Sequence, residues 1–231
     1  MTSPQTKRKI LTYPNPYLRE EAQAVERFDE NLKALFEEMC FLMHESEGVG
    51  LAATQVGESL QLLVLSSYVF LSEEERKQVT ESEDGDMGED LAIINPKVLE
   101  QSEDELIDFE GCLSFPDVYI KVKRPSWVVI TAQDIEGNPI ELRGEGFGAR
   151  AILHEMDHLN GKVMTDHLSF LAKQKALKDH QRIQKRLAKK RAEENGSSAQ
   201  NQTSKVNKTK SSHAKSKKGS SKAKKGQKKK R

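Results

Sequence analysis

The chain is poor in cysteine and lacks any long apolar run, with only two cysteines among its 231 residues. Two cysteines are too few for the disulfide framework of a small secreted protein, so a reducing compartment is expected. No apolar run approaches the roughly 20 residues that span a bilayer, and the N-terminal segment MTSPQTKRKI lacks an apolar stretch of signal-peptide length. The sequence therefore predicts a soluble, cytoplasmic protein with no membrane partner.

Charge is distributed unevenly, although the formal net charge is only +1. Residues 195–231 hold 13 Lys or Arg and no acid, which leaves 24 basic against 36 acidic residues in 1–194. An acidic body thus precedes a basic tail that has too little apolar surface to fold. We predict a folded domain over 1–194 and a disordered basic tail over 195–231.

Hydrophobic periodicity predicts helices over 29–45, about 146–160 and 166–194, with Gly161 as a stop signal for the second. A glycine-rich turn is expected at 48–57. The acidic segment 72–90 is interpreted as a surface insertion with room for one helical turn.

Short β-branched or alternating segments, separated by turn signals, predict strands. Their close spacing without intervening helices indicates antiparallel pairing. The fold class is therefore α+β, with antiparallel strands packed around a central helix, an N-terminal helix and a long C-terminal helix. The predicted strands cover 59–66, 91–100, 103–109, 117–123, 126–133 and 139–143.

The clearest chemical signal is His154-Glu155-Met156-Asp157-His158, which fits H-E-x-x-H. Residues four apart project from the same face of a helix, so both imidazoles can reach one metal ion. Glu155 follows the first histidine closely enough to act on a reacting water without being a ligand. The motif predicts a metal-dependent hydrolase.

Two histidines leave such a centre incomplete, because a catalytic zinc-type site needs three protein ligands and an open position. A zincin-like protease takes its third ligand downstream, but Met164 stands where the extended zincin pattern has a histidine. Upstream, Cys112 lies in the segment EGCLS, and spacing alone leaves a metal ligand and a buried structural cysteine equally open. A non-enzymatic nucleic-acid-binding protein with a structural metal is a further alternative, since it would explain the basic tail.

Three segments together resemble the peptide deformylases. Residues 48–55 (GVGLAATQ) are similar to the family's G-x-G-L-A-A-x-Q, residues 110–114 match E-G-C-L-S, and residues 154–158 match H-E-x-D-H. They occur in the family's order, and the resemblance covers about residues 8–185. Each motif alone is moderate evidence, but the ordered set is highly specific.

The resemblance implies removal of the N-formyl group from formyl-methionine of nascent polypeptides, with release of formate. It assigns one divalent metal ion to Cys112, His154 and His158. In this family the ion is typically Fe²⁺, with Zn²⁺ or Ni²⁺ also able to occupy the site.

The same resemblance assigns catalytic roles to three further residues. Glu155 would move the proton of the attacking water to the leaving amine. The Gln55 side chain and the Leu113 backbone N–H would stabilise the oxyanion of the tetrahedral intermediate.

Substrate contacts are expected along the segments that carry the resemblance, where the glycines at 48 and 50 let a peptide approach the backbone closely. Helical spacing adds walls for the methionine side chain, while Arg150, within reach of the same face, departs from the apolar residue of many relatives. The predicted substrate-binding residues are Val49, Gly50, Glu110, Gly111, Phe147 and Ala151.

Bacterial members of the family dock a C-terminal helix on the ribosome. By this resemblance, residues 166–194 are expected to bind the ribosome. The tail over 195–231 could add sequence-independent attraction to ribosomal RNA. A tail that serves only solubility is the alternative.

Overall fold

The computed structural model describes residues 8–81 and 88–189, so the predicted tail and the predicted domain boundary at 194 lie outside the described residues. Contacts divide the chain into two units, Met1–His180 and Gln181–Arg231. The first unit holds every predicted site residue. In the part that the structure describes, no helix is long and apolar enough to cross a membrane.

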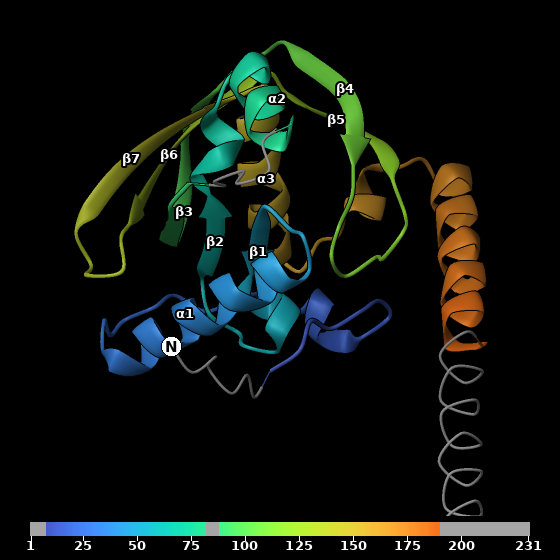
Figure 1. Cartoon of the computed structure of the whole chain (residues 1–231), viewed down its shortest axis with the longest axis horizontal. Helices are drawn as coiled ribbons and strands as arrows, with labels where there is room; N and C mark the ends of the chain where they lie inside the picture. The colour runs from blue at the N-terminus through green and yellow to red at the C-terminus, as the bar shows by residue number, and fades with distance from the viewer. Residues whose placement is uncertain (1–7, 82–87, 190–231) are drawn as a thin grey trace, which may run out of the picture. The chain divides into compact units, whose positions relative to one another are not determined.

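A five-stranded antiparallel sheet lies at the centre of the first unit, in the order β1-β2-β3-β6-β7 (Figure 1). All five residues of β2 are buried, because apolar side chains occupy both faces of this strand. The strands are β1 (Gly50–Ala52), β2 (Leu62–Ser66), β3 (Asp90–Gln101), β6 (Trp127–Gln133) and β7 (Pro139–Glu145).

Helices α1 (Glu30–Glu45) and α3 (Phe147–Leu159) pack on opposite faces of this sheet. The core cluster with α1 includes Leu62 and Val64 of β2, whereas the cluster with α3 includes the intervening Leu63. Successive residues of a strand point to opposite faces, so one strand contributes to both clusters. The predicted α+β architecture with a central helix is confirmed.

Strands β4 (Glu105–Glu110) and β5 (Ile120–Pro125) form a separate two-stranded antiparallel sheet. We call this the β4–β5 hairpin. Residues 111–119 connect its strands and carry Cys112. Helix α3 contacts both the five-stranded sheet and the hairpin.

Local hydrogen bonds explain where the two main helices begin and end. The Asp29 carboxylate caps α1 by accepting from the backbone N–H groups of Asn31 and Leu32. Helix α3 ends just before Gly161, whose φ of +65° favours glycine, and an added Cβ there would lie 2.6 Å from the Arg19 carbonyl oxygen. The predicted stop signal at Gly161 is therefore correct.

Two predicted irregular segments contain regular structure. Within 48–57 the structure has strand β1 and a 3-10 helix (Ala53–Val56), which a glycine-rich composition does not reveal. The acidic insertion holds α2 (Glu73–Glu81), a longer helix than the single turn expected, although none of its residues is buried. Its start is a capping box, because Ser72 Oγ accepts from the Glu75 N–H while the Glu75 carboxylate accepts from the Ser72 N–H.

The helix predicted over 166–194 begins later than expected. A 3-10 helix (Met164–His167) comes first, and the α-helix covers residues 170–180 of the first unit. Asp166 favours the separate turn, because its carboxylate accepts from the Val163 N–H and pairs with Arg19. In the second unit, the described residues 181–189 are helical.

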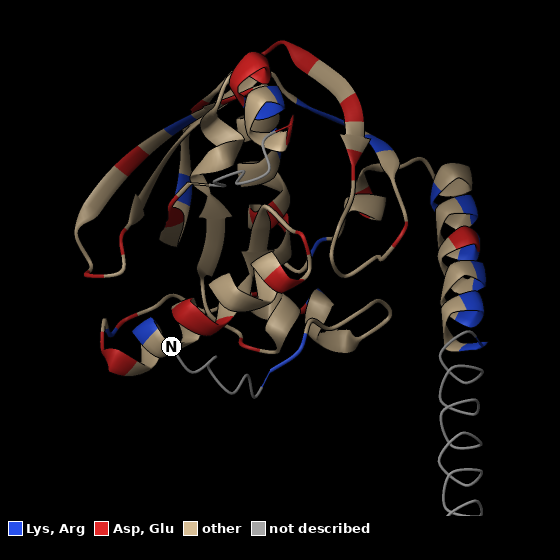
Figure 2. Ribbon diagram, viewed as in Figure 1, with Lys and Arg blue, Asp and Glu red and all other residues tan. Residues whose placement is uncertain are grey.

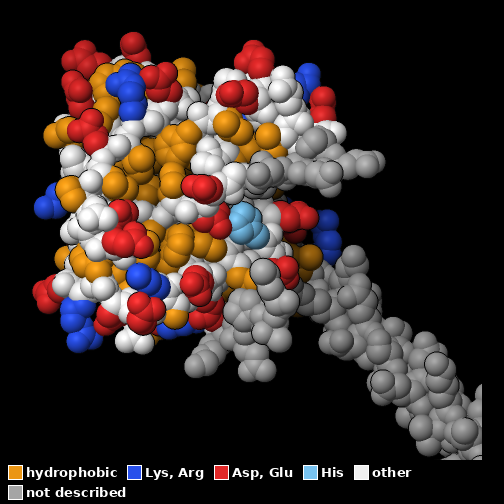
Figure 3. All heavy atoms as spheres, turned by 60° about the vertical axis from the view of Figure 1, so that its left-hand side comes forward, with side chains coloured by type: hydrophobic (Ala, Val, Ile, Leu, Met, Phe, Trp, Pro, Cys, Tyr) orange, Lys and Arg blue, Asp and Glu red, His pale blue; other side chains and the backbone are white. Residues whose placement is uncertain are grey.

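The surface charge follows the uneven distribution seen in the sequence. Acidic side chains are spread over the first unit (Figure 2), and the face shown in Figure 3 carries more Asp and Glu than Lys and Arg. The described residues 181–189 contain basic side chains and no acidic one. The basic residues there are Arg182, Lys185, Arg186 and Lys189.

Candidate metal centre

Three predicted ligands meet at the inner face of α3. His154 and His158 lie one helical turn apart, both buried, with ring centroids 5.1 Å from each other. Cys112 reaches them from the loop after β4, and its Sγ lies 3.2 Å from Nε2 of His158. One ligand atom from each side chain lies within 4.8 Å of the others, so the three can bind a single ion.

The chemistry of the donors also fits a divalent ion. Burial alone would raise the pKa of the Cys112 thiol, but the neighbouring His158 and His154 outweigh it and lower this pKa to about 5. Cys112 is therefore a thiolate at neutral pH, the form that binds metals. One thiolate and two imidazoles form a three-ligand set that leaves a position open for a reactant.

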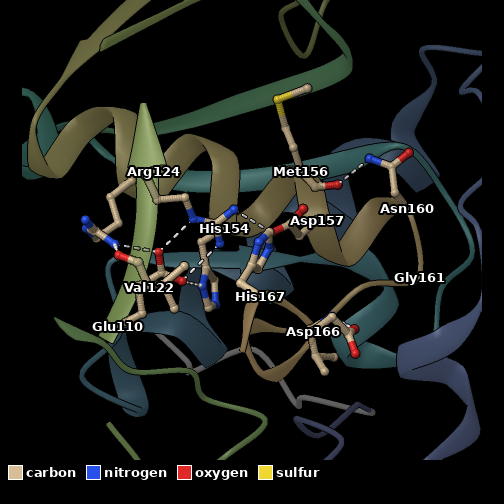
Figure 4. Close-up of polar contacts among 12 residues, drawn as sticks. Glu110, Val122, Arg124, His154, Met156, Asp157, Asn160, Gly161, Asp166 and His167 are labelled. Atoms are coloured by element: carbon tan, nitrogen blue, oxygen red, sulfur yellow. Dashed lines mark hydrogen bonds and ion pairs between the residues drawn. The ribbon is translucent and has the colours of Figure 1, made fainter. Parts of the chain in front are cut away.

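A carboxylate behind the centre fixes the orientation of His154. Glu110, at the end of β4, is buried and its Oε2 lies 2.9 Å from Nδ1 of His154. In Figure 4, dashed lines join Glu110 of β4 both to His154 and to Arg124 of β5. Because Glu110 is an acceptor, Nδ1 of His154 carries the proton and Nε2 is left free for a metal.

Two buried arginines hold this carboxylate. Arg124 of β5 donates from Nε and Nη2 to the two Glu110 oxygens at 2.8 and 3.0 Å, and Arg150 of α3 donates from Nη1 at 2.9 Å. Arg124 also donates to Asp157 at 2.6 Å. We call Glu110, Arg124, Arg150, His154 and Asp157 the Glu110 network.

The Glu110 network keeps its central carboxylate ionised. Burial alone would raise the pKa of Glu110, but hydrogen bonds from His154 and Arg124 outweigh it and hold this pKa well below its usual range. Asp157 behaves in the same way, because its bonds to His167 and Arg124 lower its pKa despite burial. Asp157 therefore joins α3 to Arg124 of β5 and to His167.

Glu155 lies beside the ligands and, unlike Glu110, is not held by a network of hydrogen bonds. It is 6% exposed, and its Oε2 has no partner among the described residues. Burial raises the pKa of Glu155 to about 7, against the opposing effect of both histidines. An added Cβ at Gly50 would lie 2.6 Å from Glu155 Oε1, so the glycine leaves room for this carboxylate.

Gln55 approaches the same place from the 3-10 helix after β1. Its side-chain oxygen accepts from the Ala52 N–H at 2.8 Å, which fixes the orientation of the amide. Its Nε2 donates to Ser114 Oγ at 3.1 Å and lies 3.6 Å from Cys112 Sγ. The amide N–H groups therefore point toward the centre.

A cavity of about 610 Å³ opens onto the centre. Four predicted site residues do not line it in the described structure. Glu110 lies in the network behind His154, Ala151 belongs to the core cluster under α3, and Gln55 and His158 are almost fully buried. The predicted residues that do line the cavity are Val49, Gly50, Gly111, Cys112, Leu113, Phe147, His154 and Glu155.

Sequence reasoning missed the arginines of the Glu110 network and Ser114. Arg124 falls between the predicted strands 117–123 and 126–133, yet it is 4% exposed inside β5. Arg150 lies four residues before His154, a spacing that could have suggested a shared partner. Neither spacing nor composition indicates that Glu110 is that partner.

The two cysteines should differ sharply in reactivity. In metal-free protein, iodoacetamide is expected to modify Cys112 at neutral pH, with a rate that falls as the pH drops below about 5 and the thiolate takes up a proton. Cys40 should stay unmodified, because burial and the nearby Asp90 raise the pKa of its thiol. Mass spectrometry of the modified peptides across a pH series measures both rates.

Added Zn²⁺ should protect Cys112, while Cys40 should stay unmodified with or without the ion. The His158→Ala variant is the matched control, since loss of the imidazole should move the reactivity of Cys112 to higher pH. A midpoint near the ordinary thiol pKa of about 8.5 in the parent would contradict the assigned environment.

The match to a known protein family falls within the first unit. Residues 7–174 match the polypeptide deformylase family. A peptide deformylase of Desulfotalea psychrophila is 42% identical over 163 residues, which cover 71% of this chain and 88% of the relative. The chloroplastic peptide deformylase 1B of Oryza sativa is 38% identical, over 70% of this chain and 55% of the relative.

Solved structures agree with these sequence matches. The crystal structure of a peptide deformylase from Legionella pneumophila superposes with a TM-score of 0.67 at 38% identity, covering 78% of this chain and 97% of that one. The enzyme from Ehrlichia chaffeensis in complex with actinonin gives a TM-score of 0.65 at 32% identity, covering 76% and 96%.

Proposed function

Because this chain belongs to the peptide deformylase family, we infer that it removes the N-formyl group from the N-terminal methionine of nascent polypeptides and releases formate. The observation that carries this conclusion is the convergence of Cys112, His154 and His158 beside Glu155. The substrate would be a formyl-methionyl peptide bound in the adjoining cavity.

The alternatives each leave a residue of this centre without a role. Among the described residues, the cluster of possible ligands includes Cys112 and none downstream of His158, as a zincin-like protease would require. A nucleic-acid-binding protein with a structural metal would need neither the buried carboxylate of Glu155 nor the oriented amide of Gln55.

Cys112, His154 and His158 would hold one divalent ion, which when bound supplies Lewis-acid polarisation of the formyl carbonyl and acidification of a water molecule. We propose Fe²⁺ as the native ion, with Zn²⁺ or Ni²⁺ able to use the same donors. The Glu110 contact supports this role, because it presents a defined nitrogen of His154 to the centre.

Glu155 is the proposed general base and acid. Its carboxylate would accept a proton from the attacking water and return it to the methionine nitrogen as the formyl C–N bond breaks. Burial makes this carboxylate a stronger base than an exposed one, because it raises the pKa of Glu155 to about 7 in the metal-free protein. The free Oε2 and the cavity beside it support direct contact with the reactants.

Gln55 and Leu113 are the proposed donors to the oxyanion of the tetrahedral intermediate. The Gln55 amide is held by Ala52, so its N–H groups need little reorganisation to reach a reacting oxygen next to Cys112. Leu113 lines the same cavity. Its backbone N–H would be the second donor.

The peptide would bind in an extended form along β1. This strand is at the edge of the five-stranded sheet, pairing with β2 on one side, and edge strands accept peptides as added strands. Val49, Gly50 and Gly111 line the cavity there, and Phe147 is the proposed wall for the methionine side chain. Glu110 and Ala151 would act from behind this surface.

Inspection of the product tests the proposed reaction against proteolysis. A formyl-Met peptide incubated anaerobically with metal-loaded protein should give formate and a peptide of unchanged length with a free amino terminus. Internal cleavage of the peptide would favour the protease alternative. Mass spectrometry of the peptide together with an assay of formate distinguishes the two results.

The state of the cysteines supports a proposal for the compartment. Both cysteines are free in the structure, which is typical of proteins in reducing compartments. We propose the cytoplasm, while noting that the relative from Oryza sativa is chloroplastic.

We also propose that basic segments after the catalytic unit bind the ribosome. Four basic side chains within 181–189 and 13 more in 195–231 suit contact with RNA phosphates. Deleting 195–231 should weaken ribosome binding and make its dependence on salt less steep, because fewer counterions are released. Cosedimentation with ribosomes across a salt series measures both effects.

Hydrolysis of a free formyl-Met peptide is the control for this deletion and should be unchanged, since every proposed site residue lies before residue 160. Equal ribosome binding by the full chain and the deletion variant at every salt concentration would show that the tail serves another purpose.

A further inference from the structure

The proposed metal ligands come from two separate parts of the fold. Cys112 follows β4 of the β4–β5 hairpin, whereas His154 and His158 belong to α3. The hairpin is not part of the five-stranded sheet. The relative placement of thiolate and imidazoles therefore depends on whatever attaches the hairpin to α3.

Arg150 is the side chain of α3 that attaches both hairpin strands. It is 5% exposed, and its guanidinium donates to the carbonyl oxygen of Leu106 in β4 at 3.0 Å and to that of Val122 in β5 at 2.9 Å. The same group donates to Glu110 Oε1 at 2.9 Å. Its planar fork thus satisfies three acceptors on the hairpin at once.

Arg150 and His154 share one carboxylate. They lie one helical turn apart, and Glu110 accepts from Arg150 at Oε1 and from His154 at Oε2. Arg124 contacts both oxygens but also binds Asp157, so its position is set from two sides. Arg124 belongs to β5, whereas Arg150 belongs to α3, the helix that carries both histidines.

We propose that Arg150 is a positioning residue that sets the geometry of the metal centre by holding the Cys112-bearing hairpin against the histidine-bearing helix. This inference rests on the proposed metal-binding function. The proposed role requires no contact between Arg150 and the substrate. In the described structure, Arg150 is accordingly absent from the lining of the cavity. The proposed role also explains a charged residue buried on the inner side of α3.

Replacing Arg150 by methionine tests the inference, because methionine is unbranched and uncharged and cannot donate to the three acceptors. The affinity for Zn²⁺, measured by competition with a chelator, should fall about 10- to 100-fold, as for other residues that orient metal ligands. The absorption bands of the Co²⁺-loaded protein should change in position or intensity, since they report the arrangement of thiolate and imidazoles.

Arg143→Met is the matched control. Arg143 is also paired with a glutamate, Glu145, but this pair is exposed on β7, and its loss should leave Zn²⁺ affinity within about twofold of the parent. Arg150→Lys keeps the charge but lacks the planar fork, so its affinity should lie between those of the parent and Arg150→Met. Circular dichroism of the metal-free variants verifies that each is folded.

Zn²⁺ affinity and Co²⁺ spectra of Arg150→Met equal to those of the parent would overturn the positioning role. If Arg150→Met does not fold, Arg150→Lys decides, and an unchanged affinity in that variant would overturn the role as well. A parent that binds no Zn²⁺ would instead overturn the proposed metal-binding function, so the two failures are distinguishable.

Discussion

Glu155→Gln is expected to lower kcat for a formyl-Met peptide by about 10²- to 10⁴-fold, the usual contribution of a positioned acid–base group. Glutamine has nearly the shape of glutamate, so it should fit beside Gly50 without disturbing the fold. It cannot accept the proton of the attacking water. Initial rates of formate release by metal-loaded parent and variant, at saturating peptide, measure the effect.

Two controls assign that loss to proton transfer. The metal content of Glu155→Gln should equal that of the parent, because Glu155 is not among the three clustered ligands. Glu145→Gln, which changes an exposed carboxylate on β7, should keep kcat within about twofold. A fully metal-loaded Glu155→Gln with the kcat of the parent would require another residue to be the base.

The histidine pair could be predicted from the sequence because its geometry is local. A spacing of four residues on a helix places His154 and His158 on one face whatever surrounds them. The structure keeps this arrangement, with both rings buried against Cys112. The assignment of Cys112 needed the family resemblance, since a cysteine distant in sequence has no fixed position relative to a helix.

The hydrogen-bond partners of Arg150 could not be predicted from the sequence pattern. Its spacing places it near the face of His154, and the sequence alone therefore suggested a disturbed methionine pocket. The structure directs its guanidinium to the hairpin instead, where Glu110 and two carbonyl oxygens accept it. These hydrogen-bond acceptors belong to chain segments that are distant from Arg150 in sequence and approach it only in the folded protein. Sequence periodicity therefore cannot predict them.

The environment of Glu110, in the E-G-C-L-S segment, could not be predicted from the sequence either. The motif suggested a substrate contact, but the carboxylate is 4% exposed and engaged by two arginines and His154. A buried carboxylate persists only with such partners, because an unpaired charge in the interior is costly. The motif identifies an essential position, whereas its role depends on contacts with β5 and α3.

Helices and strands could be predicted where buried apolar residues recur at regular spacing. Elements without such a pattern were harder to predict. The helix expected over 29–45 is found as α1, because its apolar stripe packs on one face of the sheet. Helix α2 has no buried face, so its start depends on the Ser72–Glu75 capping box, which the acidic composition concealed. Strand β1 has only three residues, too few for any alternation to appear.

Removal of the metal should have the other very large effect, because the proposed role of Cys112, His154 and His158 is to hold the ion that would activate the water and the formyl carbonyl. Chelation should abolish formate release while leaving the fold intact, since neither core cluster includes any of the three ligands. Anaerobic addition of Fe²⁺ should restore activity. Zn²⁺ or Ni²⁺ should restore it to an extent that depends on the ion.

The most direct test of the central claim combines metal content with formate release on the same anaerobic samples. Parent protein reloaded with increasing Fe²⁺ should release formate from a formyl-Met peptide in proportion to bound metal, up to one ion per chain, and Cys112→Ala should bind little metal and release little formate. Formate release that is independent of bound metal, or no formate from the fully loaded parent, would contradict the account.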